Sequence, residues 1–335
     1  MSDVNKIKGK SEKMGIVITG GAGFIGSNLA RFLKDQYKIT IIDNRKDLEA
    51  IDDFKNEINF IGIDILNYQK VSKVIQKADG IIHLAAVSRV IWGYEDPFRC
   101  ITTNVAGTAN ILEATRKSNK KPWIIFGSSR EVYGENGKLP LNENAPYKSA
   151  NIYSASKISA ELICEKFSTD YGLSIGISRF SNVYGGIYDI LDRVIPRFIL
   201  SAIYDEIINI HGGDQLFDFT HISDTINGIT KLVKKLEEGK SFFDKFHFLT
   251  GVPSSLQDIV NLLQRNLNKK LEIEIFPPRS YDVMKFYGNP IKSKETLDFT
   301  AKIRLKEGIQ KTLQLYLQEL KNNRELFESR MVWRK

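Results

Sequence analysis

The stretch Ile16-Val17-Ile18-Thr19-Gly20-Gly21-Ala22-Gly23-Phe24-Ile25-Gly26 decides the fold of this 335-residue chain. An apolar, β-branched run ends in a glycine cluster, and the residues that follow have the spacing of a helix. Strand, tight turn and helix in this order bring a helix N-terminus to the place where a dinucleotide pyrophosphate binds. The first two glycines permit the turn, Gly23 lets the backbone approach the phosphates, and Gly26 allows close packing of helix on strand.

A second predicted strand, Lys38–Ile42, ends at Asp43. An acidic residue at this place is positioned to bind the hydroxyls of the adenosine ribose, which favours NAD over NADP. Arg45 stands close by and could attract the 2′-phosphate of NADP. The competing interpretation is an ordinary glycine turn followed by a surface Asp. The strand and helix that flank the glycines favour the cofactor loop.

Strand-like runs alternate with helical patterns through the first half of the chain. The predicted strands are Gly15–Thr19, Lys38–Ile42, Ile58–Gly62, Gly80–Leu84, Trp123–Phe126 and Ser174–Arg179. The predicted helices are Ile25–Gln36, Tyr68–Lys77, Asn104–Ser118 and Tyr153–Tyr171. This alternation predicts an α/β fold with a Rossmann-type, doubly wound parallel sheet. Functional side chains should then lie beyond the carboxyl ends of the strands.

After about Arg179 the loops become longer, and pairs of glycines and prolines punctuate them. Shorter helices are predicted near Arg193–Tyr204, Ser223–Glu237, Ser255–Asn266 and Leu305–Asn322. We therefore expect a flexible tail over residues 1–13 and an NAD-binding Rossmann domain over residues 14–180. Residues 181–335 should form mainly a smaller C-terminal substrate-binding lobe, from which some segments can return to the Rossmann domain.

Composition indicates an ordinary globular protein, with 42% hydrophobic and 26% charged residues. No apolar run approaches the roughly 20 residues of a membrane helix, and the first 13 residues contain no apolar secretory segment. Cys100 and Cys164 stand apart, as buried thiols do in a reducing compartment. We expect a cytoplasmic protein without membrane contact.

The formal net charge of +8 invites a comparison with nucleic-acid-binding proteins. The lysines are dispersed, however, and Lys231, Lys234 and Lys235 stand next to Glu237 and Glu238 on one predicted helix, as on a solvated face. We expect no nucleic-acid partner, and the basic bias suits an anionic small substrate. No pair of the four histidines has the spacing of metal ligands, so no metal site is predicted. His83 ends a predicted strand and should pack there.

Tyr153 and Lys157 stand four residues apart at the start of a predicted helix and so share one helical face. A nearby ammonium stabilises a phenolate and lowers the pKa of a Tyr, which would make Tyr153 a usable general base. The spacing alone is common on amphipathic helices. A companion segment adds to it, because the strand before Ser129 would place that hydroxyl where a substrate oxygen needs a hydrogen-bond donor.

These segments together resemble the extended short-chain dehydrogenases/reductases, in the group of nucleotide-sugar epimerases and dehydratases. The resemblance runs from Gly15 to about Tyr316. The matching motifs, in order, are Gly20–Gly26, Asp43, Asp64-Ile65, His83–Ala86, Asn104–Thr108, Ser128–Gly134, Tyr153–Lys157, Arg179–Gly185 and Asp218–Asp224.

The resemblance implies NAD as the cofactor and a nucleotide-diphosphate sugar as the substrate. It implies NAD contacts at Gly20, Gly23, Phe24, Ile25, Gly26, Asp43, Asn44, Asp64, Ile65, Leu84, Ala85, Ala86, Asn104, Tyr153 and Lys157. It implies substrate contacts at Ser88, Ser129, Arg130, Asn182, Arg193 and Arg279. Family members commonly pair through the helices that match Asn104–Ser118 and Tyr153–Tyr171, so a homodimer is expected.

In this family Tyr and Ser or Thr assist removal of a proton from a sugar hydroxyl, usually at C4, while a hydride passes to NAD. The 4-keto sugar can return as the C4 epimer, lose water between C5 and C6, or lose a uronic carboxylate. Dehydratases and decarboxylases use a Glu at the place of Glu131 for the second step. Here the triplet is Ser129-Arg130-Glu131, and Arg130 replaces the acid of one dehydratase class with a group that cannot donate a proton usefully.

Glu131 has two interpretations that the sequence does not separate, an acid/base group or an ion-pair partner of Arg130. We expect a 4-epimerase with Ser129, Glu131, Tyr153 and Lys157 as catalytic residues. The alternatives are a 4,6-dehydratase or decarboxylase that uses Glu131 after C4 oxidation, and an NAD-binding module without turnover.

The substrate lobe departs from the family pattern at one place. Phe217 stands where members often carry an Arg that binds the diphosphate. Arg279 matches a second phosphate-binding Arg of the family and is favoured for that role. Arg193 is another candidate, and its competing interpretation is a charge on a helix surface.

Overall fold

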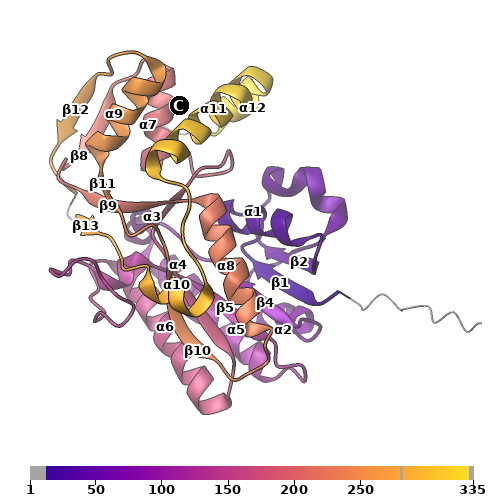
Figure 1. The fold of residues 1–335 in the computed structure, drawn as a ribbon. Helices are drawn as coiled ribbons and strands as arrows, with labels where there is room; N and C mark the ends of the chain where they lie inside the picture. Colours follow the sequence, from indigo (N-terminus) through magenta and orange to yellow (C-terminus); the bar gives the residue numbers. More distant parts are fainter. Residues whose placement is uncertain (1–12, 280–281, 332–335) are drawn as a thin grey trace, which may run out of the picture.

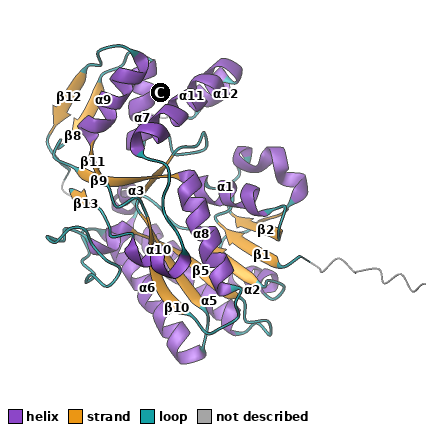
Figure 2. Cartoon of the chain, viewed as in Figure 1, coloured by secondary structure: helices purple, strands orange, loops and turns teal. Residues whose placement is uncertain are grey.

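The computed structural model describes residues 13–279 and 282–331. The tail expected over residues 1–13 therefore lies, apart from Lys13, outside the described residues. The centre of the molecule is a seven-stranded sheet whose neighbouring strands all run parallel (Figures 1 and 2). In spatial order its strands are β10 (Phe243–Phe248), β6 (Ile175–Phe180), β5 (Trp123–Ser129), β4 (Gly80–His83), β1 (Gly15–Thr19), β2 (Lys38–Asp43) and β3 (Asn59–Gly62).

The strand order confirms the predicted doubly wound α/β fold. From β1 the chain adds β2 and β3 on one side, then crosses to β4, β5 and β6 on the other. A crevice for ligands opens beyond the carboxyl ends of the strands where such an order reverses. In this chain that point is the end of β1, which is occupied by the glycine cluster.

Helices cover both faces of the sheet (Figure 1). One face carries α1 (Phe24–Leu33), α8 (Ile222–Leu236) and the 3₁₀ segment Glu49–Glu57, and α10 (Ile291–Leu297) packs beside α8. The other face carries α2 (Tyr68–Ile75), α5 (Gly107–Arg116) and α6 (Ile152–Tyr171). Between β4 and α5 the chain forms α3 (Val90–Glu95), α4 (Pro97–Ile101) and a π-helical segment, Thr102–Ala106.

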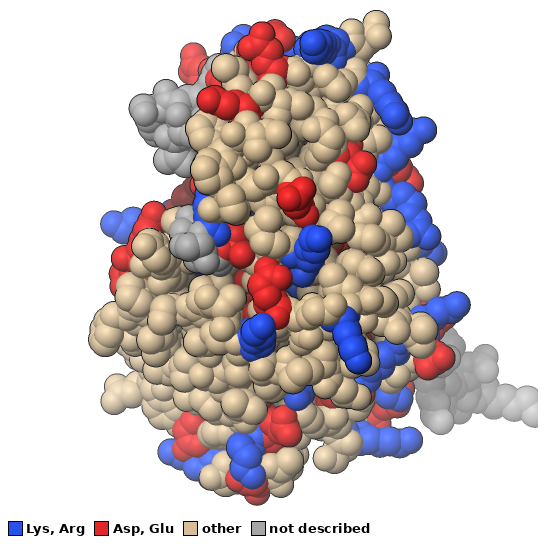
Figure 3. Space-filling view, turned by 90° about the vertical axis from the view of Figure 1, so that its left-hand side faces the viewer, with Lys and Arg blue, Asp and Glu red and all other residues tan. Residues whose placement is uncertain are grey.

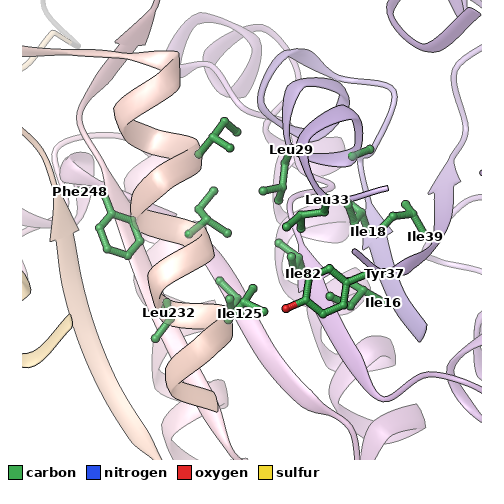
Figure 4. Packing of buried hydrophobic residues seen from close by; sticks show 14 of the residues in the cluster. Ile16, Ile18, Leu29, Leu33, Tyr37, Ile39, Ile82, Ile125, Leu232 and Phe248 are labelled. Atoms are coloured by element: carbon green, nitrogen blue, oxygen red, sulfur yellow. The ribbon is translucent and has the colours of Figure 1, made fainter. Parts of the chain in front are cut away.

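Alternation along the strands divides the interior into two cores, because successive side chains point to opposite faces of a sheet. Ile16 and Ile18 of β1 pack with Leu29 and Leu33 of α1, and Val17 packs on the opposite face. Figure 4 shows the first of these cores, where Leu232 of α8 lies beside Ile125. Strands that are buried on both faces explain why the predicted runs were almost continuously apolar.

The second half of the chain builds a smaller lobe beyond the carboxyl ends of the strands, at the top of Figure 1. Its own core unites residues of the lobe helices and of two short paired strands. The lobe elements are α7 (Val194–Ile203), β8 (Ile208–His211), α9 (Leu256–Leu267), β12 (Ile273–Phe276), α11 (Leu305–Asn322) and α12 (Arg324–Ser329). A further small sheet joins β7 (Asn182–Tyr184), β9 (Leu216–His221), β11 (Pro253–Ser255) and β13 (Lys285–Phe286).

Two segments of the second half belong to the central sheet. The helix predicted near Ser223–Glu237 forms as α8 but packs on the sheet, because it carries a broad apolar face that includes Ile229 and Leu232. β10 extends the sheet beyond β6 as the seventh strand. β5 also runs three residues beyond its predicted end, through Ser129, because its last residues pair with β6.

Acidic and basic side chains are interspersed on the face shown in Figure 3. Lys234 pairs with Glu237 and Lys235 with Glu238, at 3.1 and 3.0 Å, so this part of α8 is the solvated face that was predicted. Within residues 13–279 and 282–331 no helix is long and apolar enough to cross a membrane. Cys100 and Cys164 are free and buried, as expected.

Candidate active site

The turn between β1 and α1 forms a backbone cradle. Gly20 has a φ of +69°, and a Cβ there would lie 2.7 Å from the backbone nitrogen of Ala85 at the end of β4. A Cβ on Gly26 would lie 2.3 Å from the carbonyl oxygen of Gly20. Gly23 precedes α1 as its N-cap and offers no side-chain cap. The first N–H groups of α1, from Phe24 and Ile25 onward, are therefore available for an anion, and this cradle fits the pyrophosphate of NAD.

Asp43 and Arg45 lie together beside this cradle. The Asp43 carboxylate accepts hydrogen bonds from the backbone nitrogens of Ala22 and Arg45, both at 3.0 Å. The Arg45 guanidinium approaches the same carboxylate at 3.9 Å, and a Cβ on Gly23 would lie 3.4 Å from its Nη2 atom. Asp43 thus fixes the glycine loop, and the two residues that bear on the choice between NAD and NADP meet at one place.

Three further residues expected to contact NAD, which are Asn44, Asp64 and Ile65, follow β2 and β3. Asn44 donates a hydrogen bond to the Asp64 carboxylate at 2.8 Å. Ile65 is buried and packs closely on Gly107. A Cβ on Gly107 would lie 2.4 Å from the Cδ1 atom of Ile65. The bond between Asn44 and Asp64 brings the ends of β2 and β3 together near Asp43.

The end of β4 closes the crevice from the other side. The Leu84 nitrogen donates to the Thr19 carbonyl at 3.0 Å, and the Ala85 nitrogen donates to the Thr19 hydroxyl at 3.2 Å. His83 is buried between the hydroxyls of Thr19 and Thr108, at 2.6 and 3.0 Å. Burial lowers the pKa of His83 to about 3. His83 is therefore a packed strand-end residue, as predicted.

Asn104, one of the residues expected to contact NAD, is buried and hydrogen-bonded within the protein. It is 2% exposed, and its amide bonds the Val87 backbone and the Ser156 hydroxyl. Because these bonds use both ends of the amide, Asn104 holds the segment after β4 against α6. Ala86 is partly exposed and Ser88 exposed, on the segment that Asn104 anchors.

Ser129 and Tyr153 meet at the centre of the crevice. Ser129 is the last residue of β5 and Tyr153 is the second residue of α6, and hydrogen bonding with Ser129 lowers the pKa of the Tyr153 hydroxyl. Asn151 begins α6 with a capping box that fixes its first turn. Tyr153 is 7% exposed. The structure thus brings these two candidate catalytic residues together.

The pKa of Tyr153 does not move in the predicted direction. Burial raises it to about 12 and the Glu131 charge adds to the rise, while the Ser129 hydrogen bond and Arg193 oppose it. Lys157 lies on the same buried side of α6, but its ammonium donates to the Gly127 carbonyl at 2.8 Å. Burial lowers the pKa of Lys157 to about 8. Desolvation, which disfavours the charged form of each group, is the largest cause of both shifts.

Glu131 forms the ion pair that was one of its two interpretations. Its Oε1 atom lies 3.0 Å from Arg130 Nη2, and the two side chains are 8% and 11% exposed. The second oxygen accepts from the Asn151 amide at 3.5 Å. The guanidinium of Arg130 lies over the ring of Phe217, 4.5 Å from its centre.

Three further residues that were expected to contact the substrate come from the second half of the chain. Asn182 begins β7, and its Nδ2 atom is buried without a hydrogen-bond partner among the described residues. Arg193 precedes α7 and pairs at 3.3 Å with Asp189, whose pKa burial raises to about 6. Arg279 is exposed, and its charge opposes a burial-driven rise in the pKa of Asp282. All three come from segments that face the carboxyl ends of the sheet.

Sequence reasoning missed a buried network beneath the crevice. Ser128 donates to Glu161 at 2.5 Å, and Arg179 pairs with the same carboxylate at 2.6 Å. Arg179 also donates to the Tyr133 hydroxyl at 2.5 Å. The network fixes the end of β5, which carries Ser129. The signal available in the sequence was an Arg inside an apolar strand, which requires a buried acid.

Among the residues that the structure describes, no three His, Cys, Asp or Glu side chains gather as a metal site would require. The site instead joins a dinucleotide cradle with a Ser–Tyr pair. This combination is typical of enzymes that transfer a hydride between a substrate and a bound dinucleotide. Residues 16–244 match the NAD-dependent epimerase/dehydratase family, and the chain belongs to that family. NAD is therefore its cofactor, and the bound nicotinamide supplies hydride transfer.

Known relatives differ in the reaction that they catalyse. The chain is 30% identical to a UDP-N-acetyl-α-D-glucosaminuronate decarboxylase of Bacillus cytotoxicus, over 92% of this chain and 98% of the relative. It is 28% identical to the solved UDP-glucose 4-epimerase of Thermotoga maritima, with a TM-score of 0.84 over 92% of this chain and all of the other. It is 26% identical to the solved UDP-glucuronic acid 4-epimerase of Bacillus cereus, with a TM-score of 0.83 over 91% and 99%.

Proposed function

We propose that this chain is an NAD-dependent nucleotide-sugar 4-epimerase that acts through a transient 4-keto sugar. The neighbouring hydroxyls of Ser129 and Tyr153 support the proposal, because together they can act as donor and acceptor for one reacting oxygen beside the dinucleotide cradle. The relatives bound to or named for UDP-sugars make a sugar nucleotide the substrate to test first.

Each residue then has a defined part. Tyr153 takes the proton of the C4 hydroxyl, and Ser129 hydrogen-bonds the same oxygen while it becomes a carbonyl. The reverse transfer, from Tyr153 to that oxygen after the sugar has turned over, gives the epimer. Lys157 holds α6 to the end of β5 through the Gly127 carbonyl. Its ammonium also favours the phenolate of Tyr153 once the crevice is filled.

The second candidate function is a 4,6-dehydratase or decarboxylase that uses Glu131 after C4 oxidation. It has its support in Glu131 itself, which is buried near Tyr153 and raises that pKa. The ion pair with Arg130 argues against it, since the guanidinium 3.0 Å away occupies the carboxylate that a second step would need. An epimerase requires no second acid/base group.

The experiment that tests the proposal is NMR of the purified chain with NAD and UDP-, dTDP-, CDP- and GDP-hexoses, and with UDP-glucuronic acid. We expect a C4 epimer without net NADH. A 4-keto-6-deoxy sugar or a pentose would instead assign a dehydratase or a decarboxylase. Bound NAD without turnover of any of these sugars would assign the binding module.

A further inference from the structure

The guanidinium of Arg130 has donors that its protein partners do not use. Nη2 pairs with Glu131, whereas Nη1 is buried and has no hydrogen-bond partner among the described residues. A guanidinium carries five N–H donors in a planar fork, and a buried donor left unpaired costs about 1–3 kcal/mol. A ligand oxygen at Nη1 would remove that cost.

Two aromatic rings hold this guanidinium in place. Its Cζ atom lies 4.5 Å from the ring centre of Phe217 and 5.8 Å from that of Phe286. These two rings come from paired residues of the parallel strands β9 and β13. A guanidinium that stacks on rings keeps the edge of its plane free for hydrogen bonds. The platform therefore fixes Arg130 as a preorganised donor and not as a loose surface charge.

Arg130 also stands beside the reacting centre. It follows Ser129 directly in the chain, and Ser129 lowers the pKa of the Tyr153 hydroxyl. The charge of its partner Glu131 acts on the Tyr153 hydroxyl. The contact with Glu131 therefore places Arg130 next to the residues proposed to hold the reacting oxygen.

We propose that Arg130 binds an oxyanion of the substrate and so determines which sugar nucleotides the site accepts. This inference rests on the proposed function. A nucleotide sugar carries such an anion in its diphosphate, and a hexuronic acid adds a carboxylate on C5, the neighbour of the reacting C4. Two parallel N–H···O bonds from Nη1 and Nη2 match either group.

Two acids surround Arg130 and compete with the substrate anion. Glu131 is bonded to Nη2, and Asp282 lies close enough for the Arg130 charge to lower its pKa against the effect of burial. Arg279 also balances Asp282. The incoming anion has to displace Glu131 from Nη2 or share that atom with it. Replacement of Glu131 by Gln should therefore tighten binding of the anion that Arg130 recognises.

The test is calorimetric binding of UDP, UDP-glucose and UDP-glucuronic acid to the NAD-loaded chain. A Tyr153→Phe background prevents turnover. Arg130→Gln should lower the affinity for UDP-glucuronic acid about 10- to 100-fold, as expected for the loss of a charge-assisted hydrogen bond. If the affinity for UDP-glucose changes by less than about twofold, the anion that Arg130 recognises is the carboxylate of the sugar. An equal loss for all three ligands identifies the diphosphate.

Arg324→Gln is the matched control, since it removes an exposed Arg–Glu pair on α12. NAD affinity and the thermal midpoint report whether each variant is folded. Unchanged affinity of folded Arg130→Gln for all three ligands overturns the inference. If Arg130→Gln does not fold, Arg130→Lys is measured instead. Lys keeps the positive charge but lacks the planar set of donors, so the affinity for the recognised ligand must fall.

The two proposals fail in distinguishable ways. If the chain epimerises a hexose and Arg130→Gln leaves every ligand affinity unchanged, only the proposed role of Arg130 is wrong. A wild-type chain that binds none of the three ligands and turns over none of the UDP-, dTDP-, CDP- and GDP-hexoses removes both. Ligand binding that depends on Arg130 without any turnover removes the epimerase and leaves the anion site.

Discussion

At the scale of single residues, Tyr153 is the group on which the proposed chemistry depends. Tyr153→Phe removes the hydroxyl that meets Ser129 and leaves the ring in its buried place. We expect kcat to fall by about 10²- to 10⁴-fold, the usual contribution of a positioned acid–base group. Single-turnover reduction of NAD measures the loss.

Tyr171→Phe is the matched control for this variant, because Tyr171 ends the same helix and is about half exposed. It should keep wild-type activity. NAD affinity should be the same in both variants. A Tyr153→Phe variant with normal kcat would show that another group moves the C4 proton.

The buried carboxyl group of Asp189 should make the free energy of unfolding depend on pH. Burial raises its pKa from 3.8 to about 6, and one of its oxygens has no hydrogen-bond partner among the described residues. The folded chain therefore binds this proton more tightly than the unfolded chain. The contribution of Asp189 is favourable at low pH and is lost as the pH rises from about 4 to about 6. Above that range the buried charge opposes folding.

Asp189→Asn should accordingly raise the free energy of unfolding at pH 8 by on the order of 1–3 kcal/mol. The advantage should disappear at pH 4, where Asp189 is protonated in the folded chain. Urea unfolding at both pH values measures it, with the exposed Asp52→Asn as control. An advantage of equal size at both pH values would assign it to a cause other than titration.

At the scale of elements, the turn from β1 to α1 positions the cofactor cradle. A Cβ on Gly26 would meet only backbone, at 2.3 Å from the Gly20 carbonyl and 2.7 Å from Gly21 Cα. Because backbone cannot rotate away, Gly26→Ala must shift α1 from β1. We expect a loss of about 1–3 kcal/mol in stability, typical of overpacking, and weaker NAD binding.

Calorimetry with NAD and thermal unfolding measure the two effects. Gly137→Ala is the matched control, since a Cβ there meets nothing within 4 Å. Normal NAD affinity and stability of Gly26→Ala would contradict the cradle as described. A loss confined to NAD affinity would show that the loop adapts while the phosphate contact does not.

The elements differ in how well the sequence predicts them, and the difference has a physical reason. β1 and β4 are local apolar runs between polar or glycine residues, so their own pattern predicts them. The last residues of β5, Gly127 to Ser129, are poor strand formers and are extended because they pair with β6. β10 carries Asp244, Lys245 and His247, and its partner strand lies far away in the chain.

The same reason separates the parts of the candidate site. The Tyr153–Lys157 spacing and the glycine loop are local, and the sequence predicts both positions. The stacking of Arg130 on Phe217 joins residues far apart in the chain, and no local pattern connects them. The pKa of Tyr153 depends on burial, which only the assembled fold determines.

At the scale of the whole molecule, the central sheet is completed by the second half of the chain. β10 pairs with β6 along six residues, and α8 covers the sheet with Ile226, Ile229 and Leu232. Without these segments β6 would be an open edge and part of one core would be exposed to water. A fragment that ends at Phe180 therefore lacks part of the structure that a Rossmann domain needs here.

This arrangement predicts that residues 13–180 expressed alone do not fold cooperatively or bind NAD, although they contain the entire glycine loop and both reacting hydroxyls. Circular dichroism during thermal unfolding and NAD titration measure this, with the full chain as the reference. The full chain should gain about 2.7 kcal/mol at an NAD concentration 100 times the Kd, because the ligand binds only the folded state. A fragment with one sharp unfolding transition and NAD affinity like that of the full chain would show that β10 and α8 are accessory. If residues 13–250 bind NAD where 13–180 do not, the returning segments are what complete the cofactor domain, and the boundary at residue 180 does not divide two independent folding units.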